Sequence, residues 1–405
     1  EGGSPGLCPG CPGRGAGHGD VAEDLIELTM GRNSAYTLIA CVVALVGLGL
    51  IMLASVGAFS PDNRGQPLFF LQRQGLWLAV GIGVCVVLSR LDPKVLVSRG
   101  LWILVGATLL VAFCLIPGIG KTVKGSARWI PLGPFAIQPG EFLKLATVIF
   151  CAMWVHQQKA RMSSPWYGLL LPMLILALPV LLLIRQPDLG SAMFVIVAAA
   201  VVLFAGGAPI LPLGVLGMAA VVGMIALAMA MPERMGRIIG FLDPEAHRQG
   251  EGYQVWQALI ALGSGGTQGL GLGQSVQKMF YLPEAHTDFI FPILGEELGL
   301  PATLGVVAVF LLFTLLGGYI ACHARDLTGM VLGIGVTALV AIQAFANLGV
   351  VTGLLPPKGV GLPFISYGGS NLVLCLAAVG ILLSLHRQAQ YREEARSRRL
   401  VGGRR

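Results

Sequence analysis

The residues best suited to chemistry lie where polar segments meet long apolar stretches. In the segment 281–291, three titratable residues precede a run of apolar side chains: Glu284, His286 and Asp288. A carboxylate at such a boundary is partly removed from water, which makes it a better proton acceptor. Asp288 is therefore the candidate general base. The alternative interpretation is that Thr287 and Asp288 only cap the helix that follows.

A second pair of charges occurs just inside an apolar stretch. Glu141 and Lys144 are three residues apart, so a helix that begins near Pro139 places both on one face. Because a charge facing lipid costs roughly 3 kcal/mol or more, the pair must face protein or a wet cavity. Its cation would hold a phosphate or a sugar, helped by Arg128. The alternative is an internal ion pair that only fixes helix packing.

Two apolar stretches are joined by the short segment 185–191, which begins at Arg185. Pro187 pushes the residue before it out of helical geometry, so the chain kinks here. Asp188 then falls in the first turn of the next helix, where the helix dipole favours a carboxylate. A plain capping role for Asp188 is the alternative.

The segment 355–371 is rich in proline and glycine and enters the last apolar stretch as a shaped loop. Lys358 is predicted to be exposed on the outer side, where it suits an anionic headgroup, and Ser366 supplies a hydroxyl. The competing interpretation is a tight re-entrant turn with no ligand.

The elements that must position these residues are membrane-spanning helices. The chain of 405 residues is 55% hydrophobic and 12% charged, with a mean hydropathy of +0.79. That composition excludes a water-soluble domain of this size. Stretches of ~18 or more apolar residues can cross a hydrocarbon core of ~30 Å, and lipid requires them to be helical. We predict an all-α polytopic membrane protein with about ten transmembrane helices, near 35–58, 67–89, 100–118, 139–156, 166–184, 188–207, 209–230, 287–319, 329–351 and 366–386.

Charges at the ends of these stretches predict the orientation. The C-terminal segment 387–405 carries seven arginines and two glutamates, so the positive-inside rule makes it a basic cytoplasmic tail. An even number of spans in the domain 35–386 then makes both termini cytoplasmic. The first segment, 1–34, is rich in Gly and Pro and is predicted to be a disordered cytoplasmic tail.

One long insertion, 231–286, is predicted to be the large extracytoplasmic loop. Within it, the spacing of apolar and aromatic residues over 253–262 predicts a short amphipathic helix at the outer surface of the bilayer. A loop of this length usually carries function.

Several chemistries lack support in the sequence. Most of the eight cysteines lie in or beside apolar stretches, and the single pair Cys8 and Cys11 has no second pair to complete a zinc site. We predict no metal site built from this chain. No P-loop or HExxH motif occurs. Glu296 and Glu297 lie about 12 Å of helix beyond Asp288, so they are interpreted as buried polar structure or loop contacts.

Separated motifs give the sequence a resemblance to a known family. They lie at 252–254, in the glycine run 263–266, at 277–291 and at 357–370. Together they resemble the SEDS family (shape, elongation, division and sporulation) over essentially 35–386, its division members more than its elongation members. The resemblance implies a peptidoglycan glycosyltransferase that polymerises lipid II into glycan strands at the outer face of the bacterial inner membrane, at the division septum.

The resemblance also implies roles for particular residues. Asp288 matches the family's essential aspartate and is the candidate catalytic residue. The charged residues of the apolar stretches match polar groups that line the family's central cavity. The chain has Gly140 where the family usually has Ser, which removes a hydroxyl and leaves the neighbouring charges in place. The candidate substrate-binding residues, from position and resemblance together, are Arg128, Glu141, Lys144, Arg185, Asp188, Gln254, Glu284, His286, Lys358 and Ser366.

The implied ligands and partners are lipid II and undecaprenyl-diphosphate-linked glycan, a class B penicillin-binding transpeptidase and other divisome proteins, with no nucleic acid. A divalent cation, Mg²⁺ or Mn²⁺, would assist at the diphosphate, and no other cofactor is expected. Two alternatives stay open. A lipid II flippase would tolerate loss of Asp288 better than loss of the charges inside the membrane, and a non-catalytic division scaffold would tolerate both.

Overall fold

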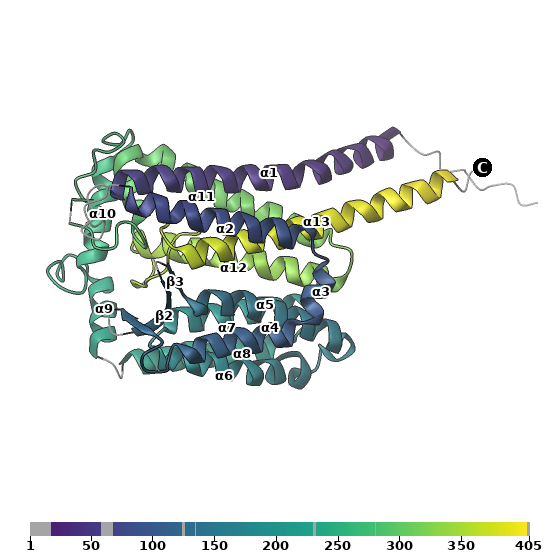
Figure 1. Cartoon of the computed structure of the whole chain (residues 1–405), viewed down its shortest axis with the longest axis horizontal. Coiled ribbons are helices and arrows are strands. Elements are labelled where there is room, and N and C mark those ends of the chain that lie inside the picture. The colour runs from purple at the N-terminus through teal and green to yellow at the C-terminus, as the bar shows by residue number, and fades with distance from the viewer. Residues whose placement is uncertain are drawn as a thin grey trace, which may run out of the picture.

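The computed structural model describes residues 18–57, 68–123, 126–133, 135–229, 232–279 and 281–402. The chain forms a bundle of long helices that lie roughly side by side (Figure 1). Each of the ten predicted stretches overlaps a long helix: α1 (His18–Gly57), α2 (Phe69–Arg90), α4 (Gly100–Phe113), α5 (Pro139–Gln158), α6 (Leu171–Arg185), α7 (Leu189–Ala205), α8 (Ile210–Met229), α11 (Ile290–Cys322), α12 (Leu327–Val351) and α13 (Gly369–Gly402). A π-helical turn, Trp166–Leu170, leads directly into α6. Shorter helices lie between them: α3 (Pro93–Ser98), α9 (Pro232–Leu242) and α10 (Tyr253–Gly265).

Six helices within the described ranges are long and apolar enough to cross a membrane. They comprise Asn33–Gly57, Phe69–Arg90, Trp166–Arg185, Ile290–Cys322, Leu327–Val351 and Gly369–Tyr391, and three shorter apolar helices accompany them. The chain is thus a predominantly helical, multi-pass membrane protein. The count of ten crossings stays a prediction, because α5 carries charged residues on its buried face and several other helices are short.

The centre of the bundle is formed by α5, α12 and α13, which pack against one another. The spans of α12 and α13 are 67% and 78% buried, whereas that of α2 is 11% buried. Large apolar side chains cover the outside, such as Trp102 of α4, which is 75% exposed. Exposed apolar surface on this scale is stable in lipid and not in water.

The all-α prediction is wrong in one detail, because the segment before α5 forms a small antiparallel sheet. Strands β1 (Lys121–Val123), β2 (Ser126–Leu132) and β3 (Phe135–Ile137) pair in sequence order. Trp129 of β2 lies opposite Lys121, and Ile130 lies opposite Ile137. Aromatic and β-branched residues favour this extended pairing. Strands this short give too few alternations for the sequence pattern to reveal them.

The segment 1–34, predicted to be a disordered cytoplasmic tail, overlaps the first described helix. Residues 1–17 lie outside the described ranges, but α1 begins at His18 and runs without a break into the first predicted span. Between Gly19 and Gly31 the chain contains no glycine or proline, so no strong helix breaker interrupts this part of α1. At the other end, α13 continues through the basic tail to Gly402.

The large loop is partly helical. The helix predicted over 253–262 is confirmed as α10, which packs against α11 and α12 and buries Val255, Ala258 and Ala261. Its place at the bilayer surface stays a prediction.

The loop after α10 fits into a break in α11. Gly299 adopts φ 74° and ψ −170°, and Pro301 has no N–H to continue the helical hydrogen bonds. A Cβ on Gly299 would lie 2.5 Å from the backbone nitrogen of Gly269, so only glycine fits this crossing. The loop supplies the missing donors, from Leu270 N to Glu296 O at 2.9 Å and from Gly271 N to Glu297 O at 3.0 Å.

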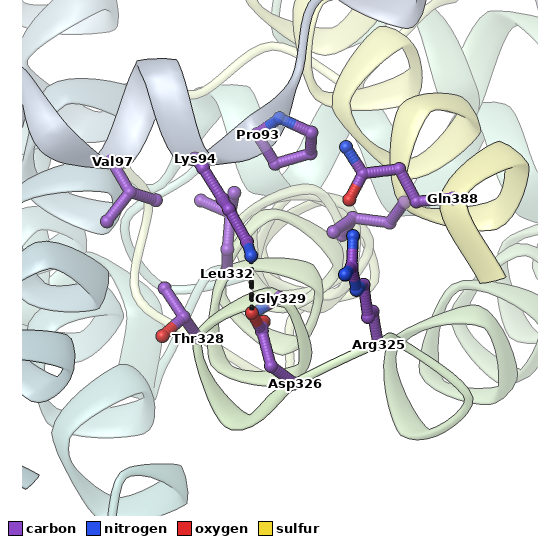
Figure 2. Close-up of a pocket in the computed structure, with 10 residues that line it drawn as sticks. Pro93, Lys94, Val97, Arg325, Asp326, Thr328, Gly329, Leu332 and Gln388 are labelled. Carbon is purple, nitrogen blue, oxygen red and sulfur yellow. Dashed lines mark hydrogen bonds and ion pairs between the residues drawn. The ribbon is translucent and has the colours of Figure 1, made fainter. Parts of the chain in front are cut away.

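The two ends of the bundle differ. The start of α1 and the end of α13 project from one end, and α9, α10, β2 and β3 lie at the other (Figure 1). A small cavity of about 10 Å³ lies near the first end, between α3, α12 and α13, and Lys94 pairs with Asp326 across it at 3.7 Å (Figure 2). This volume holds about one water, so it is no substrate site.

Candidate active site at one end of the bundle

Strand β2 carries Arg128 to the start of α7, where Asp188 is the N-cap residue. The Asp188 carboxylate accepts hydrogen bonds from the Ser191 backbone N–H at 3.1 Å and from the Ser191 hydroxyl at 2.8 Å. Arg128 Nη1 lies 3.9 Å from Asp188 Oδ1, and Arg128 Nη2 donates to the carbonyl of Pro187 at 2.6 Å. The capping role of Asp188 is therefore confirmed, and the same carboxylate also faces a cation.

Glu141 and Lys144 form the ion pair predicted from their spacing, with Nζ and Oε1 2.7 Å apart. Both side chains are buried, and Lys144 Nζ also donates to Gln343 Oε1 at 3.3 Å. The other oxygen, Glu141 Oε2, is buried and has no hydrogen-bond partner within the described part of the chain. The pair thus faces the protein interior and leaves one acceptor open there.

Lys358 is half-buried, so the prediction of an exposed lysine is wrong. The loop between α12 and α13 turns its side chain inward, where Nζ lies 5.3 Å from the centre of the Phe194 ring. Lys144 Nζ lies 5.0 Å from the same ring. A Cβ on Gly190 would lie 3.0 Å from Lys358 Cε and 3.2 Å from Asp188 Oδ1, so the lysine reaches the start of α7.

The electrostatics of Lys358 follow from this position. Burial lowers the pKa of its ammonium group to about 8; Asp188 opposes the shift and Lys144 adds to it. We call the five converging residues Arg128, Glu141, Lys144, Asp188 and Lys358 the charged cluster. It holds three cations and two carboxylates, which is an arrangement that favours binding of an anionic group.

Asp288 lies beside the cluster on a separate loop. The N-cap of α11 is Phe289, with no side-chain capping bond, so the interpretation of Thr287 and Asp288 as a simple cap is wrong. The carboxylate is turned toward the loop before α13 instead: a Cβ on Gly359 would lie 3.0 Å from Asp288 Oδ2. Since Gly359 directly follows Lys358, the candidate base and the cluster are joined through two adjacent residues.

Hydrogen bonds fix the Asp288 loop to the loop before α13. Ser366 is buried, and its hydroxyl donates to the carbonyl of Thr287 at 2.6 Å and accepts the N–H of Leu362 at 2.7 Å. The N–H of Tyr367 donates to the carbonyl of His286 at 2.9 Å. The Ser366 hydroxyl is thus used to position backbone, and a role in substrate binding stays a prediction.

The other titratable residues of the loop lie close by. His286 stacks with Phe70 of α2, with ring centres 4.5 Å apart, and lies 5.9 Å from the ring of Tyr367. Glu284 has a φ of 58°, a strained backbone for a residue with a side chain, and its carboxylate accepts from the Thr287 hydroxyl at 3.0 Å. Strain of this kind is held by the surrounding contacts and is frequent at functional sites.

Two predicted site residues lie apart from these. Arg185 is exposed at the end of α6, and Gln254 is half-buried in the first turn of α10. In the described ranges, no hydrogen bond or ion pair joins either residue to the charged cluster. Sequence reasoning missed Gln343 and Asn347 of α12, although two amides in an otherwise apolar stretch are a signal that could have drawn attention to them.

The donor set does not suit a resident metal. Across the residues that the structure describes, no group of three His, Cys, Asp or Glu side chains could hold a metal ion. The carboxylates of the charged cluster already face Lys144 and Arg128, and the cluster has an excess of cations. The Mg²⁺ or Mn²⁺ expected at the diphosphate stays a prediction, because such an ion is usually held by one or two carboxylates together with substrate phosphates.

Fold and site together define a multi-pass helical membrane protein in which the loop that carries Asp288 lies beside a charged cluster. Residues 36–391 match the model of the FtsW, RodA and SpoVE family, described as "Cell cycle protein", and the chain belongs to this family. The predicted resemblance is thereby confirmed.

Relatives match nearly the whole chain. One from Pseudomonas fluorescens is 39% identical over 359 residues, 88% of each chain. Another from Thioalkalivibrio sulfidiphilus is 40% identical over 392 residues, 95% of this chain and 97% of the relative. Both carry the name "Probable peptidoglycan glycosyltransferase FtsW".

Solved structures share the fold. A chain of the structure "Structural coordination of polymerization and crosslinking by a peptidoglycan synthase complex" has a TM-score of 0.70 and 28% identity, over 87% of this chain and 98% of that chain. The rod shape determining protein RodA of Thermus thermophilus has a TM-score of 0.64 and 27% identity, over 87% and 97%.

Proposed function

We propose that this protein is a peptidoglycan glycosyltransferase that polymerises lipid II during septal cell-wall synthesis. The observation that carries the proposal is the position of the Asp288 carboxylate against Gly359, the residue that directly follows Lys358 of the charged cluster. A transferase of this class needs a proton acceptor for one sugar and cations for the diphosphate of the other, held side by side. The names of the relatives support the same activity.

The reaction follows from these positions. The Asp288 carboxylate accepts the proton of the acceptor sugar's 4-hydroxyl as that oxygen attacks the anomeric carbon of the donor. The bond between the anomeric carbon and the diphosphate oxygen breaks, and its electron pair leaves with the undecaprenyl diphosphate. Lys144, Arg128 and Lys358 stabilise the negative charge that develops on the leaving group. Glu141 Oε2 is an acceptor available to a substrate hydroxyl or amide.

The setting belongs to the same proposal. We infer ten membrane crossings, both termini in the cytoplasm and the active site at the outer face. Strand β2, which carries Arg128 of the charged cluster, lies at the end of the bundle opposite the start of α1 and the end of α13 (Figure 1). A class B penicillin-binding transpeptidase is the inferred partner. The inference is supported by the similarity of this fold to a chain from the structure of a peptidoglycan synthase complex that coordinates polymerization and crosslinking. No step is assigned to a divalent cation.

The test is polymerisation of labelled lipid II by the purified protein with its cognate transpeptidase, with moenomycin present to exclude contaminating glycosyltransferases. Glycan chains support the proposal. Transfer of lipid II across vesicles with no chains would favour the flippase, which the buried charges of α5 and α7 could also serve. The absence of both glycan chains and lipid II transfer would favour a non-catalytic scaffold.

A glycine substitution tests whether the position of Asp288 matters. In Gly359→Ala, the added methyl lies 3.0 Å from Asp288 Oδ2, so the carboxylate must move by a few tenths of an ångström. We expect the polymerisation rate to fall roughly tenfold, because small displacements of reacting groups are costly. Gly368→Ala is the matched control, since its methyl comes no closer than 3.7 Å to any neighbour. Equal rates in both variants would contradict the placement.

The pKa of Lys358 predicts how kcat/KM for polymerisation changes at alkaline pH. With a pKa of about 8, its charge is present below pH 8 and lost above it, so donor binding should weaken as the pH rises through about 8. We expect kcat/KM to fall about tenfold per pH unit beyond that point. Lys358→Arg keeps its charge and should move the fall to higher pH. An alkaline fall at the same pH in both proteins would assign it to another group.

A further inference from the structure

Helix α12 carries two buried amide side chains one turn apart, Gln343 and Asn347, each 1% exposed. Residues four apart lie on the same face of a helix. This face meets the loop before α13, and the two amides bond consecutive carbonyls of that loop. Asn347 Nδ2 donates to Val360 O at 2.6 Å, and Gln343 Nε2 donates to Gly361 O at 3.1 Å.

Asn347 makes its second bond toward the candidate base. Its Nδ2 also donates to the backbone carbonyl of Asp288, at 2.8 Å. One amide group thus fixes the backbone of Asp288 to Val360, the residue after the Gly359 that faces the Asp288 carboxylate. Asn347 thus adds a direct bridge between the two loops to the bonds that Ser366 and Tyr367 make to Thr287 and His286.

Gln343 makes its further bonds toward the charged cluster. Its Oε1 accepts from Lys144 Nζ at 3.3 Å, and its Nε2 also donates to Asn371 Oδ1 at 2.8 Å. The amide therefore holds the ammonium group of Lys144 against the same loop that Asn347 holds against Asp288. Lys358 lies on that loop, two residues before Val360.

Keeping these amides in the bundle has a cost that packing alone does not repay. A buried amide loses its hydrogen bonds to water and must regain them from the protein. Asn347 regains only part of them, because its Oδ1 is buried with no partner among the described residues. The two donors of Asn347 are satisfied, and both point to the loops of the site.

We propose that Gln343 and Asn347 are positioning residues that set the separation of the two halves of the active site: Asn347 fixes Asp288, and Gln343 fixes Lys144, both against residues 360 and 361. The inference rests on the proposed function, because it assigns the two halves to the acceptor and the donor. The two amides have different roles in this proposal. Asn347 serves the proton acceptor and so the chemical step, and Gln343 serves the cation and so donor binding.

The test compares Asn347→Ala and Gln343→Ala in steady-state polymerisation over a range of lipid II concentrations. We expect Asn347→Ala to lower kcat by about tenfold or more with KM nearly unchanged, and Gln343→Ala to raise KM by about fivefold or more. Thr337→Val is the matched control. Thr337 is buried in the same helix, but its hydroxyl bonds only the carbonyl of Gly333 in α12, so both constants should stay near those of the wild type.

A second measurement separates positioning from loss of folded protein. Each variant is also made in the Asp288→Asn background, where lipid II binding is measured without turnover. Full binding stoichiometry for Asn347→Ala, with kcat reduced, supports the inference. The inference is overturned if kcat and the number of lipid II binding sites per protein fall by the same factor. It is also overturned if both amide variants have the kcat and KM of the wild type. Wild-type turnover by Asp288→Asn alone would instead overturn the base assignment in the proposed function.

Discussion

Replacing Asp288 by asparagine is expected to lower the rate of polymerisation at saturating lipid II by about 10²- to 10⁴-fold, the usual contribution of a general base. Asparagine keeps the size of the side chain and removes the carboxylate that accepts the proton. The backbone bond from Asn347 to the carbonyl of residue 288 stays in place, so the loop should keep its position. The KM for lipid II should change little, because the cations of the charged cluster are untouched.

The control is Asp243→Asn. Asp243 is an exposed aspartate of the large loop 231–286, and its carboxylate accepts the N–H of Ala246 at 3.0 Å. It should polymerise at the wild-type rate, since its bond lies far from the cluster along the loop. Melting temperature and lipid II binding are measured for both variants. A folded Asp288→Asn protein that makes wild-type amounts of polymer would exclude Asp288 as the base. It would also favour the flippase, which needs the charges inside the membrane but not Asp288.

A charge inside an apolar stretch is one signal that the sequence offers. Glu141, Lys144 and Asp188 could be selected because a charge that faces lipid is too costly, so the fold must enclose it. Their convergence with Lys358 could not be predicted, since it depends on how the loop before α13 folds back over the start of α7. The expected exposure of Lys358 was wrong for the same reason.

The amides of α12 show which site residues are hard to recognise from the sequence. Gln343 and Asn347 carry no charge, so they cost less in a membrane helix and stand out less in the sequence. Their hydrogen bonds to residues 360 and 361, to the carbonyl of Asp288 and from Lys144 distinguish them from amides that serve packing. The helices themselves were predictable because length and hydropathy define them, whereas the sheet at 121–137 depends on pairing between very short strands.

The second large effect concerns the anchor of the large loop. Lys278 Nζ pairs with Glu297 Oε1 at 2.7 Å, with both side chains fully buried, and also donates to the Ser55 hydroxyl of α1 at 2.9 Å. The neighbouring Glu296 accepts the Ser275 hydroxyl and the N–H of Val276. The prediction that both glutamates are buried polar structure or loop contacts is therefore confirmed, since they are both. They hold the loop that leads to Asp288 against the break in α11.

We expect Lys278→Met to destabilise the protein by about 3–5 kcal/mol, because it leaves the Glu297 carboxylate buried without its cation. Thermal unfolding of the purified protein should begin at a markedly lower temperature. The double variant Lys278→Met with Glu297→Met should recover most of the loss, since two apolar side chains replace the pair. Lys94→Met is the matched control: its ion pair with Asp326 is largely exposed and should contribute about 1 kcal/mol or less (Figure 2).

The double variant also separates stability from activity. If the ion pair only holds the loop in place, the double variant should regain both thermal stability and polymerisation, since the bonds of Glu296 and the break at Gly299 still fix the loop. If stability returns and polymerisation does not, the charges at 278 and 297 contribute to the active site itself. Equal unfolding temperatures for Lys278→Met and Lys94→Met would mean that the buried pair does not anchor the loop. The path from α10 to Asp288 would then depend on the bonds that the Glu296 carboxylate accepts and on the backbone bonds to Glu296 and Glu297.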